Sequence, residues 1–292
     1  MRYRLRHYTH YHYADEVEQA HNQVRMLLRE VPHQTCLQRG IRVRPSPRYA
    51  KMHMDHFGNR VLYFELDRAH TDARIFATHE VEVRAPQVPA ADSTPPWPQV
   101  AARIRQHADE EARLLHVYSL PSARVNLPAG IEALVQGHFP PGRPILQAAL
   151  SLAQAIFEEF EFNAKATTIA TPLATVLEQR KGVCQDFAHL MIAALRSQGL
   201  AARYVSGYIE TLPPPGKERL VGADASHAWV SLWCGEAGWV DIDPTNNQIP
   251  GEGHITTAWG RDYDDVIPLN GVIFGGGEES TLKVQVDVQR LG

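Results

Sequence analysis

Residues 181–200 read KGVCQDFAHLMIAALRSQGL, and this stretch predicts a buried helix with a cysteine in its first turn. Its apolar residues recur at the i, i+3, i+4, i+7 and i+8 spacing of one helix face. They are Phe187, Leu190, Met191, Ala194 and Leu195. Gly199 is the residue type that commonly ends a helix. We therefore expect a helix over 184–198 that packs on the core through this apolar stripe.

The position of Cys184 at the start of that helix points to a chemical role. Unpaired backbone N–H groups and the helix dipole favour a negative charge there, and the thiolate is the nucleophilic form of cysteine. The chain has three cysteines, far apart and in no CxxC or Cys/His ligand spacing. This pattern predicts neither a disulfide framework nor a structural zinc. We expect Cys36 and Cys234 to be small hydrophobic core residues.

A nucleophilic cysteine normally needs a base and a group that orients the base. His227 opens the strand-like run HAWVSLW, and Asp243 ends the next strand-like run, GWVDID. The chain order is therefore Cys, His, Asp, taken from a helix start and two successive strands.

The loop between those two runs decides which aspartate can reach His227. Asp241 and Asp243 share one strand face, because side chains alternate along a strand. A three-residue loop at 235–237 makes Asp243 the same-face diagonal neighbour of His227, about 7–8 Å away. Asp241 would lie roughly 13 Å away. A two-residue loop would turn both aspartates away, so the choice of Asp243 depends on this register.

The sequence on either side predicts an α+β protein with a small antiparallel β domain ahead of the catalytic core. Alternating runs and turn signals predict strands within 1–84. Residues 85–98, APQVPAADSTPPWP, contain five prolines and form the predicted linker. Helices and then strands are predicted within 99–292, the expected catalytic domain. The last strand, 281–290, has two possible places, in the catalytic sheet or in the N-terminal domain.

Three segments carry a resemblance to a known family. GVCQDFAHL, SHAWVSLW and GWVDIDPTNN are similar to the three catalytic boxes of the transglutaminase-like superfamily, whose core resembles papain-type cysteine proteases. LRSQGLAARYVSGYIE resembles the same family, and residues 1–84 and 261–271 do so more weakly. The resemblance implies a cysteine-bearing helix packed on an antiparallel sheet. It also implies that Cys184 is the nucleophile, His227 the general base and Asp243 the orienting carboxylate.

The implied reaction is attack of Cys184 on a peptide or glutamine amide, with a thioester intermediate. Water as the acceptor gives a protease, amidase or deamidase, and we favour this outcome for a bacterial-type chain with such a β domain. An amine acceptor gives a transglutaminase, and a non-catalytic binding scaffold is the third alternative. Trp229, Asp186 and Asp241 are candidates for supporting the site or shaping a substrate channel. For Asp186 the simpler interpretation is a carboxylate favoured by the helix dipole.

Composition excludes several other classes. The chain has 292 residues and a formal net charge of −4, so no overall basic field favours nucleic acid or an anionic membrane. No apolar run approaches membrane-span length, and no apolar segment follows the basic start as in a secretory signal. We therefore expect a cytoplasmic protein. The family resemblance implies a protein or peptide substrate.

No metal or other cofactor is expected, although the chain has 15 histidines. The HExxH motif is absent, and neither His10 with His12 nor the Cys184, His227 and Asp243 set matches a zinc-site spacing. The sequence leaves the oligomeric state open.

Overall fold

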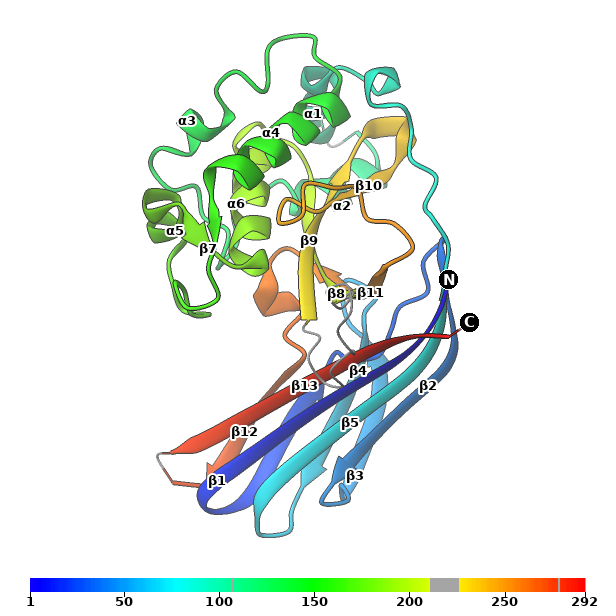
Figure 1. The fold of residues 1–292 in the computed structure, drawn as a ribbon, viewed down its shortest axis with the longest axis vertical. Coiled ribbons are helices and arrows are strands. Elements are labelled where there is room, and N and C mark those ends of the chain that lie inside the picture. The colour runs from blue at the N-terminus through cyan, green and yellow to red at the C-terminus, as the bar shows by residue number, and fades with distance from the viewer. Residues whose placement is uncertain (107, 211–225, 278, 292) are drawn as a thin grey trace, which may run out of the picture.

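The computed structural model describes residues 1–106, 108–210, 226–277 and 279–291, and the chain folds into two bodies. In Figure 1 the helices gather in an upper body around a four-stranded sheet, and a curled antiparallel sheet forms the lower body. The two termini lie close together where the bodies meet, because the first strand pairs with the last. The α+β class expected from the sequence is confirmed.

The lower sheet has seven strands in the described chain and is built around its first strand. The strands are β1 (Arg2–Val24), β2 (Gln34–Arg44), β3 (Tyr49–Met54), β4 (Arg60–Leu66), β5 (His70–Val83), β12 (Leu269–Gly275) and β13 (Ser280–Leu291). The first half of β1 lies between β5 and β13, and its second half lies between β4 and β12. Alternating residues of β1, such as Tyr3 and Leu5, are fully buried, as expected for a sheet with one covered face.

The C-terminal strands β12 and β13 both pair with β1 in the lower sheet. The sequence left two places open for the strand at 281–290, and β13 takes the one in the N-terminal body. Strand β12 also lies there, although the predicted catalytic domain of residues 99–292 included it. The alternation in β13 buries Val286 and Val288 against Tyr3 and Leu5. The alternation of apolar and polar residues along β13 indicates which face of the strand is buried. Only the strand pairing in the structure shows which strand lies beside it.

The upper body combines six helices of the described chain with a sheet ordered β10-β9-β8-β11. The sheet strands are β8 (Ala202–Ile209), β9 (Ser226–Trp233), β10 (Trp239–Ile242) and β11 (His254–Gly260). The helices are α1 (Trp97–Gln106), α2 (Glu110–Val117), α3 (Ile131–Val135), α4 (Ile145–Glu159), α5 (Leu173–Gln179) and α6 (Cys184–Ser197). Short elements complete it: β6 (Glu161–Phe162), β7 (Lys181–Gly182), η1 (Ala91–Ser93), η2 (Gly235–Ala237) and η3 (Tyr263–Asp265).

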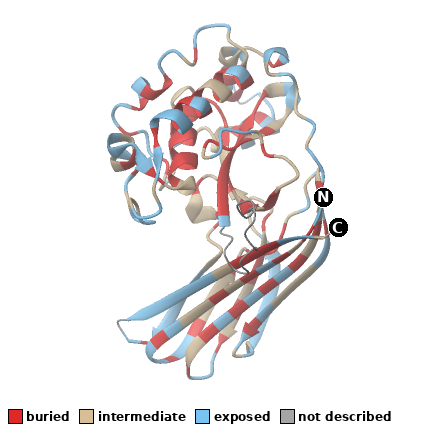
Figure 2. Cartoon of the chain, in the orientation of Figure 1, coloured by how far each residue is buried: buried red, intermediate tan, exposed pale blue. Residues whose placement is uncertain are grey.

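The helix predicted over 184–198 is confirmed as α6, but it is more deeply buried than its apolar stripe indicated. Every residue from 186 to 196 is buried, including His189 and Arg196. The helices α3, α4 and α5 cover one side of α6 and the strands β8 and β9 cover the other, as the buried centre of the upper body in Figure 2 shows. Arg196 is tolerated there because its guanidinium donates to the backbone carbonyls of Tyr118, Ala202 and Arg261.

Two amide side chains fasten the lower body to β11, the edge strand of the upper sheet. Gln34 accepts from the backbone N–H of Thr256 and donates to its carbonyl, both at 2.8 Å. Asn59 does the same for Trp259, at 3.0 and 2.9 Å. Each amide thus satisfies the outward-facing backbone groups that a neighbouring strand would otherwise bond. These contacts hold the two bodies in one relative position.

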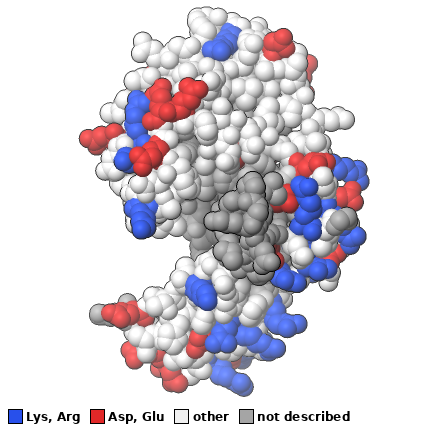
Figure 3. All heavy atoms as spheres, in the orientation of Figure 1, with Lys and Arg blue, Asp and Glu red and all other residues white. Residues whose placement is uncertain are grey.

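No helix among the described residues is long and apolar enough to cross a membrane. On the face shown in Figure 3, acidic and basic side chains occur on both bodies, and much of the upper body is uncharged.

Candidate active site

Cys184 is the first residue of α6 and is partly exposed, whereas Cys36 and Cys234 are buried. The helix start is closed by Asp186, whose carboxylate accepts from the backbone N–H of Val183 at 2.9 Å and from the Thr167 hydroxyl at 2.6 Å. Burial raises the pKa of Asp186 above its ordinary value. Asp186 therefore lies in the first turn of α6, the position expected for a carboxylate that is favoured by the helix dipole.

The hairpin formed by β9 and β10 has the register that a three-residue loop predicts. Trp239 pairs with Trp233, and the ladder continues to Ile242 opposite Val230. The loop between the strands is the short helix η2. This register is confirmed for the four pairs of the ladder.

With this register, Asp243 lies next to His227. The Nε2 atom of His227 is 2.8 Å from the Oδ2 atom of Asp243. The other aspartate, Asp241, instead accepts a hydrogen bond from the indole of Trp229 at 2.9 Å. The structure therefore separates the two aspartates that parity alone could not distinguish.

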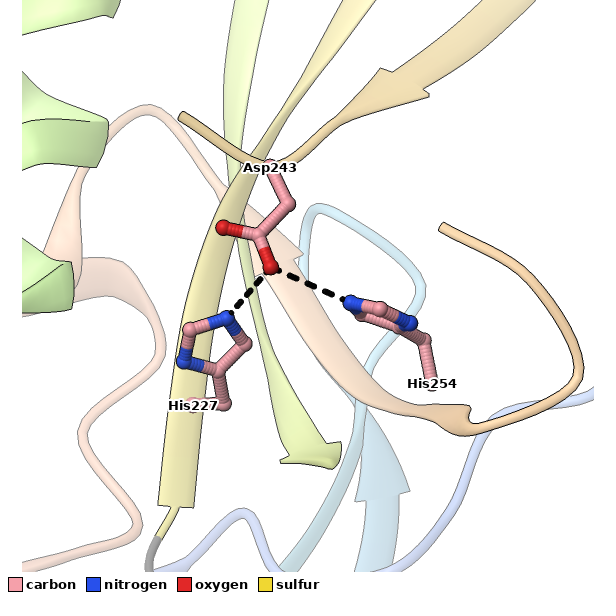
Figure 4. A group of neighbouring side chains, drawn as sticks. All are labelled: His227, Asp243 and His254. Atoms are coloured by element: carbon pink, nitrogen blue, oxygen red, sulfur yellow. Dashed lines mark hydrogen bonds and ion pairs between the residues drawn. The ribbon is translucent and has the colours of Figure 1, made fainter. Parts of the chain in front are cut away.

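Asp243 is fully buried, and its carboxylate accepts five hydrogen bonds from described residues. Its Oδ2 atom accepts from His227, from His254 Nε2 at 3.2 Å and from the Asn246 amide at 2.7 Å. Figure 4 shows this carboxylate oxygen between the two imidazole rings. The Oδ1 atom accepts from the backbone N–H groups of Thr245 and Asn246 at 3.0 and 3.3 Å. Burial opposes ionisation, but the hydrogen bonds outweigh it and hold the pKa of Asp243 below its usual range.

His227 connects this carboxylate to the thiol. Its Nε2 bonds Asp243, and the Cys184 thiol interacts electrostatically with the same ring. Burial alone lowers the pKa of His227, but the hydrogen bonds and negative charges of Asp243 and Cys184 raise it to about 10. The protonated imidazolium is therefore the favoured form of His227 at neutral pH.

Trp229 forms a wall behind the two histidines. Its ring is fully buried, with its centroid 6.1 Å from that of His227 and 5.3 Å from that of His254. Gly207 makes room for this ring, because a Cβ atom there would lie 2.5 Å from the Trp229 side chain. Trp229 therefore packs against both histidines from a buried position.

Sequence reasoning missed His254 and Asn246. Asn246 belongs to the DPTNN segment, so its nearness to Asp243 was readable from a short spacing. His254 comes from a different strand, β11, and the sequence carries no signal that its imidazole reaches Asp243.

His227, Asp243 and His254 also form the set of side chains best able to hold a metal ion among the described residues. One ligand atom from each lies within 4.8 Å of the others. The distances from both histidines to Asp243 are those of hydrogen bonds, and the site is deeply buried. His10 and His12, the other pair considered, lie beside Asp72 in the lower sheet.

Comparison with known proteins gives matches to both bodies. A family profile described as the transglutaminase-like superfamily matches residues 133–244, which contain Cys184, His227 and Asp243. A second profile, the bacterial transglutaminase-like N-terminal region, matches residues 3–82.

Individual proteins match as well. An uncharacterized protein of Mycobacterium tuberculosis is 37% identical over 294 residues, covering 98% of this chain and 92% of the relative. A protein-glutamine gamma-glutamyltransferase of Pseudomonas aeruginosa is 30% identical over 203 residues, covering 64% of this chain but 28% of that protein. The crystal structure of a candidate cysteine protease from Cytophaga hutchinsonii has the same fold, with a TM-score of 0.73 and 19% identity, covering 100% of this chain and 92% of that one.

Proposed function

Because the chain belongs to the transglutaminase-like superfamily, we propose that it is a cysteine-dependent acyl-transfer enzyme that acts on peptide or glutamine amides. The observation that carries the proposal is the series Cys184, His227 and Asp243, in which the His227 ring hydrogen-bonds Asp243 and interacts electrostatically with Cys184. A non-catalytic binding scaffold would have no need for a partly exposed thiol near a histidine whose pKa is raised by a buried carboxylate. The series supplies the nucleophile, the proton carrier and the orienting group that acyl transfer needs.

In the first half-reaction the Cys184 thiolate attacks the amide carbonyl carbon, and the carbonyl electrons move onto its oxygen. The backbone N–H of Cys184 at the helix start is the natural donor to that oxyanion. The carbon–nitrogen bond then breaks, and the departing amine takes a proton from the His227 imidazolium. A thioester on Cys184 and a neutral imidazole remain.

In the second half-reaction the neutral His227 accepts a proton from the incoming acceptor as that acceptor attacks the thioester. The carbon–sulfur bond breaks, which restores the thiolate and the imidazolium. Throughout the cycle the Asp243 carboxylate keeps Nε2 of His227 protonated, so that Nδ1 is the atom available to the thiol and substrate.

We propose water as the main acceptor, so that the net reaction is hydrolysis. Partial exposure of Cys184 supports this assignment, because solvent can reach a thioester there. The alternative is an amine acceptor, and the similarity to the Pseudomonas aeruginosa gamma-glutamyltransferase favours it as the second candidate.

The deciding experiment is incubation of the purified protein with a library of glutamine-containing proteins, with and without an excess of primary amine. Mass spectrometry distinguishes cleaved peptides, glutamine converted to glutamate, and amine adducts. Hydrolysis products that dominate even with amine present support the proposal, and dominant adducts favour a transglutaminase. Cys184→Ala is the matched control, and products that persist in this variant would contradict a thioester on Cys184.

A further inference from the structure

A cavity of about 710 Å³ lies between the outer face of the upper sheet and the chain that joins the two bodies. Its walls include Arg203, Trp239 and Asp241 from the sheet and residues 84–88 from the connecting chain. Cys184, His227 and Asp243 are not part of its lining. A cavity of this volume is within the range that binds small molecules.

Arg203 is held in this wall by aromatic stacking. The central carbon of its guanidinium lies 4.1 Å from the ring centroid of Trp239 and 3.7 Å from that of Trp259. The guanidinium of Arg29 stacks on Trp259 as well, at 3.5 Å. Stacking occupies the flat faces of the Arg203 guanidinium, so its N–H donors point outward around the edge of the group.

One donor of the Arg203 guanidinium lacks an acceptor in the part of the chain that the structure describes. Its Nε atom is buried and has no hydrogen-bond partner there. The charge of Asp241 acts on Arg203, but the Asp241 carboxylate is bound to the indole of Trp229. A buried guanidinium donor without an acceptor is unfavourable and is uncommon in folded proteins.

The other residues that line the cavity indicate which kind of ligand could supply a hydrogen-bond acceptor to Arg203. Pro32, Pro86, Ile249 and Pro250 are apolar wall residues. The other arginine in the wall, Arg84, is paired with Glu82. His33, Gln87 and Thr256 also line the cavity, so its wall is mixed, with Arg203 among its charged residues.

We propose that this cavity binds a small organic carboxylate with an apolar body. The two carboxylate oxygens would accept from the planar edge of Arg203, a geometry that guanidinium and carboxylate share. The apolar body would pack against the prolines and the two indole rings. A dianionic phosphate fits less well, because Asp241 already contributes a negative charge to the wall.

The test measures binding to the full-length protein by isothermal titration calorimetry, with 4-phenylbutyrate and hexanoate as probes. Each acid is compared with its neutral amide, and inorganic phosphate is a third probe. We expect saturable 1:1 binding of at least one acid, with its amide and phosphate at least tenfold weaker.

Two variants locate the site. Arg203→Lys keeps the charge but loses the planar edge, and Ala85→Trp fills the cavity from an exposed wall position while leaving Arg203 in place. Each is expected to weaken binding of the acid at least tenfold. Arg84→Lys, in the same wall but paired with Glu82, is the matched control and should bind as the unaltered protein does.

Equal binding of acid and amide, or no binding of either acid at millimolar concentration, would overturn the proposal. Unchanged affinity in Ala85→Trp would do so as well, even if Arg203→Lys failed to fold. None of these measurements depends on turnover at Cys184, so they test the cavity independently of the proposed reaction.

Discussion

Replacement of Asp243 by asparagine removes the negative charge beside His227 while keeping the size of the side chain. The pKa of His227 is raised from 6.5 to about 10 by Asp243 and Cys184 together. At about 1.4 kcal/mol for each pKa unit, this rise corresponds to roughly 5 kcal/mol in favour of the imidazolium. Asp243 is the first of the groups that raise this pKa, so removing its charge should lower kcat by roughly tenfold to a hundredfold.

The variant should also change the pH dependence. The imidazolium is lost as the pH rises through the pKa of His227, so a lower pKa moves this loss to lower pH. We expect the NMR titration of the His227 ring to move from about 10 to lower pH in Asp243→Asn. Release of ammonia from a glutamine-containing peptide gives kcat over the same pH range.

Asp241→Asn is the matched control, because it makes the same chemical change two residues earlier in the chain. Asp241 bonds Trp229 and not His227, so kcat should change less than threefold. Thermal stability can fall by about 1 kcal/mol from the weakened indole hydrogen bond. Equal losses of kcat in the two variants, or an unchanged His227 titration in Asp243→Asn, would refute the reasoning.

Three further predictions concern other residues. Iodoacetamide at pH 6.5 should label Cys184 faster than Cys36 and Cys234, because both of these are buried and burial raises their pKa; similar rates by peptide mass spectrometry would contradict this. His254→Ala should lower kcat about tenfold through loss of one donor to the orienting carboxylate, and His254→Gln should recover part of it if the N–H is what matters. Burial lowers the pKa of His79 from 6.5 to about 4, so the unfolded chain binds the proton more tightly and stability falls as the pH drops from 6.5 to 4. Thermal melts at pH 7 and 4.5 should differ less in His79→Gln, and an unchanged difference would show that His79 does not contribute.

Local pattern alone predicted the parts of the site that depend on neighbours in the sequence. The apolar spacing after Cys184 predicted α6, because a helix places residues three and four apart on one face. Loop length predicted the register of β9 and β10, because a hairpin is closed by a few residues. The register in turn brought Asp243, and not Asp241, to His227. Each of these inferences spans short distances along the chain, where covalent geometry limits the choices.

Only the tertiary structure decided the contacts between distant segments. The alternation in β13 indicated a half-buried strand, but any exposed strand edge could have accepted it, and the choice of β1 depended on the fit of the two bodies. In the same way, His254 reaches Asp243 because β11 carries it there, and Arg203 lies between Trp239 and Trp259 because strands from separate parts of the chain are neighbours. The sequence by itself therefore determined the helix, the hairpin and the candidate nucleophile, base and carboxylate. Packing determined which distant side chains hold that carboxylate and which cavity Arg203 faces, because a periodic pattern specifies the buried face of an element and not its partner.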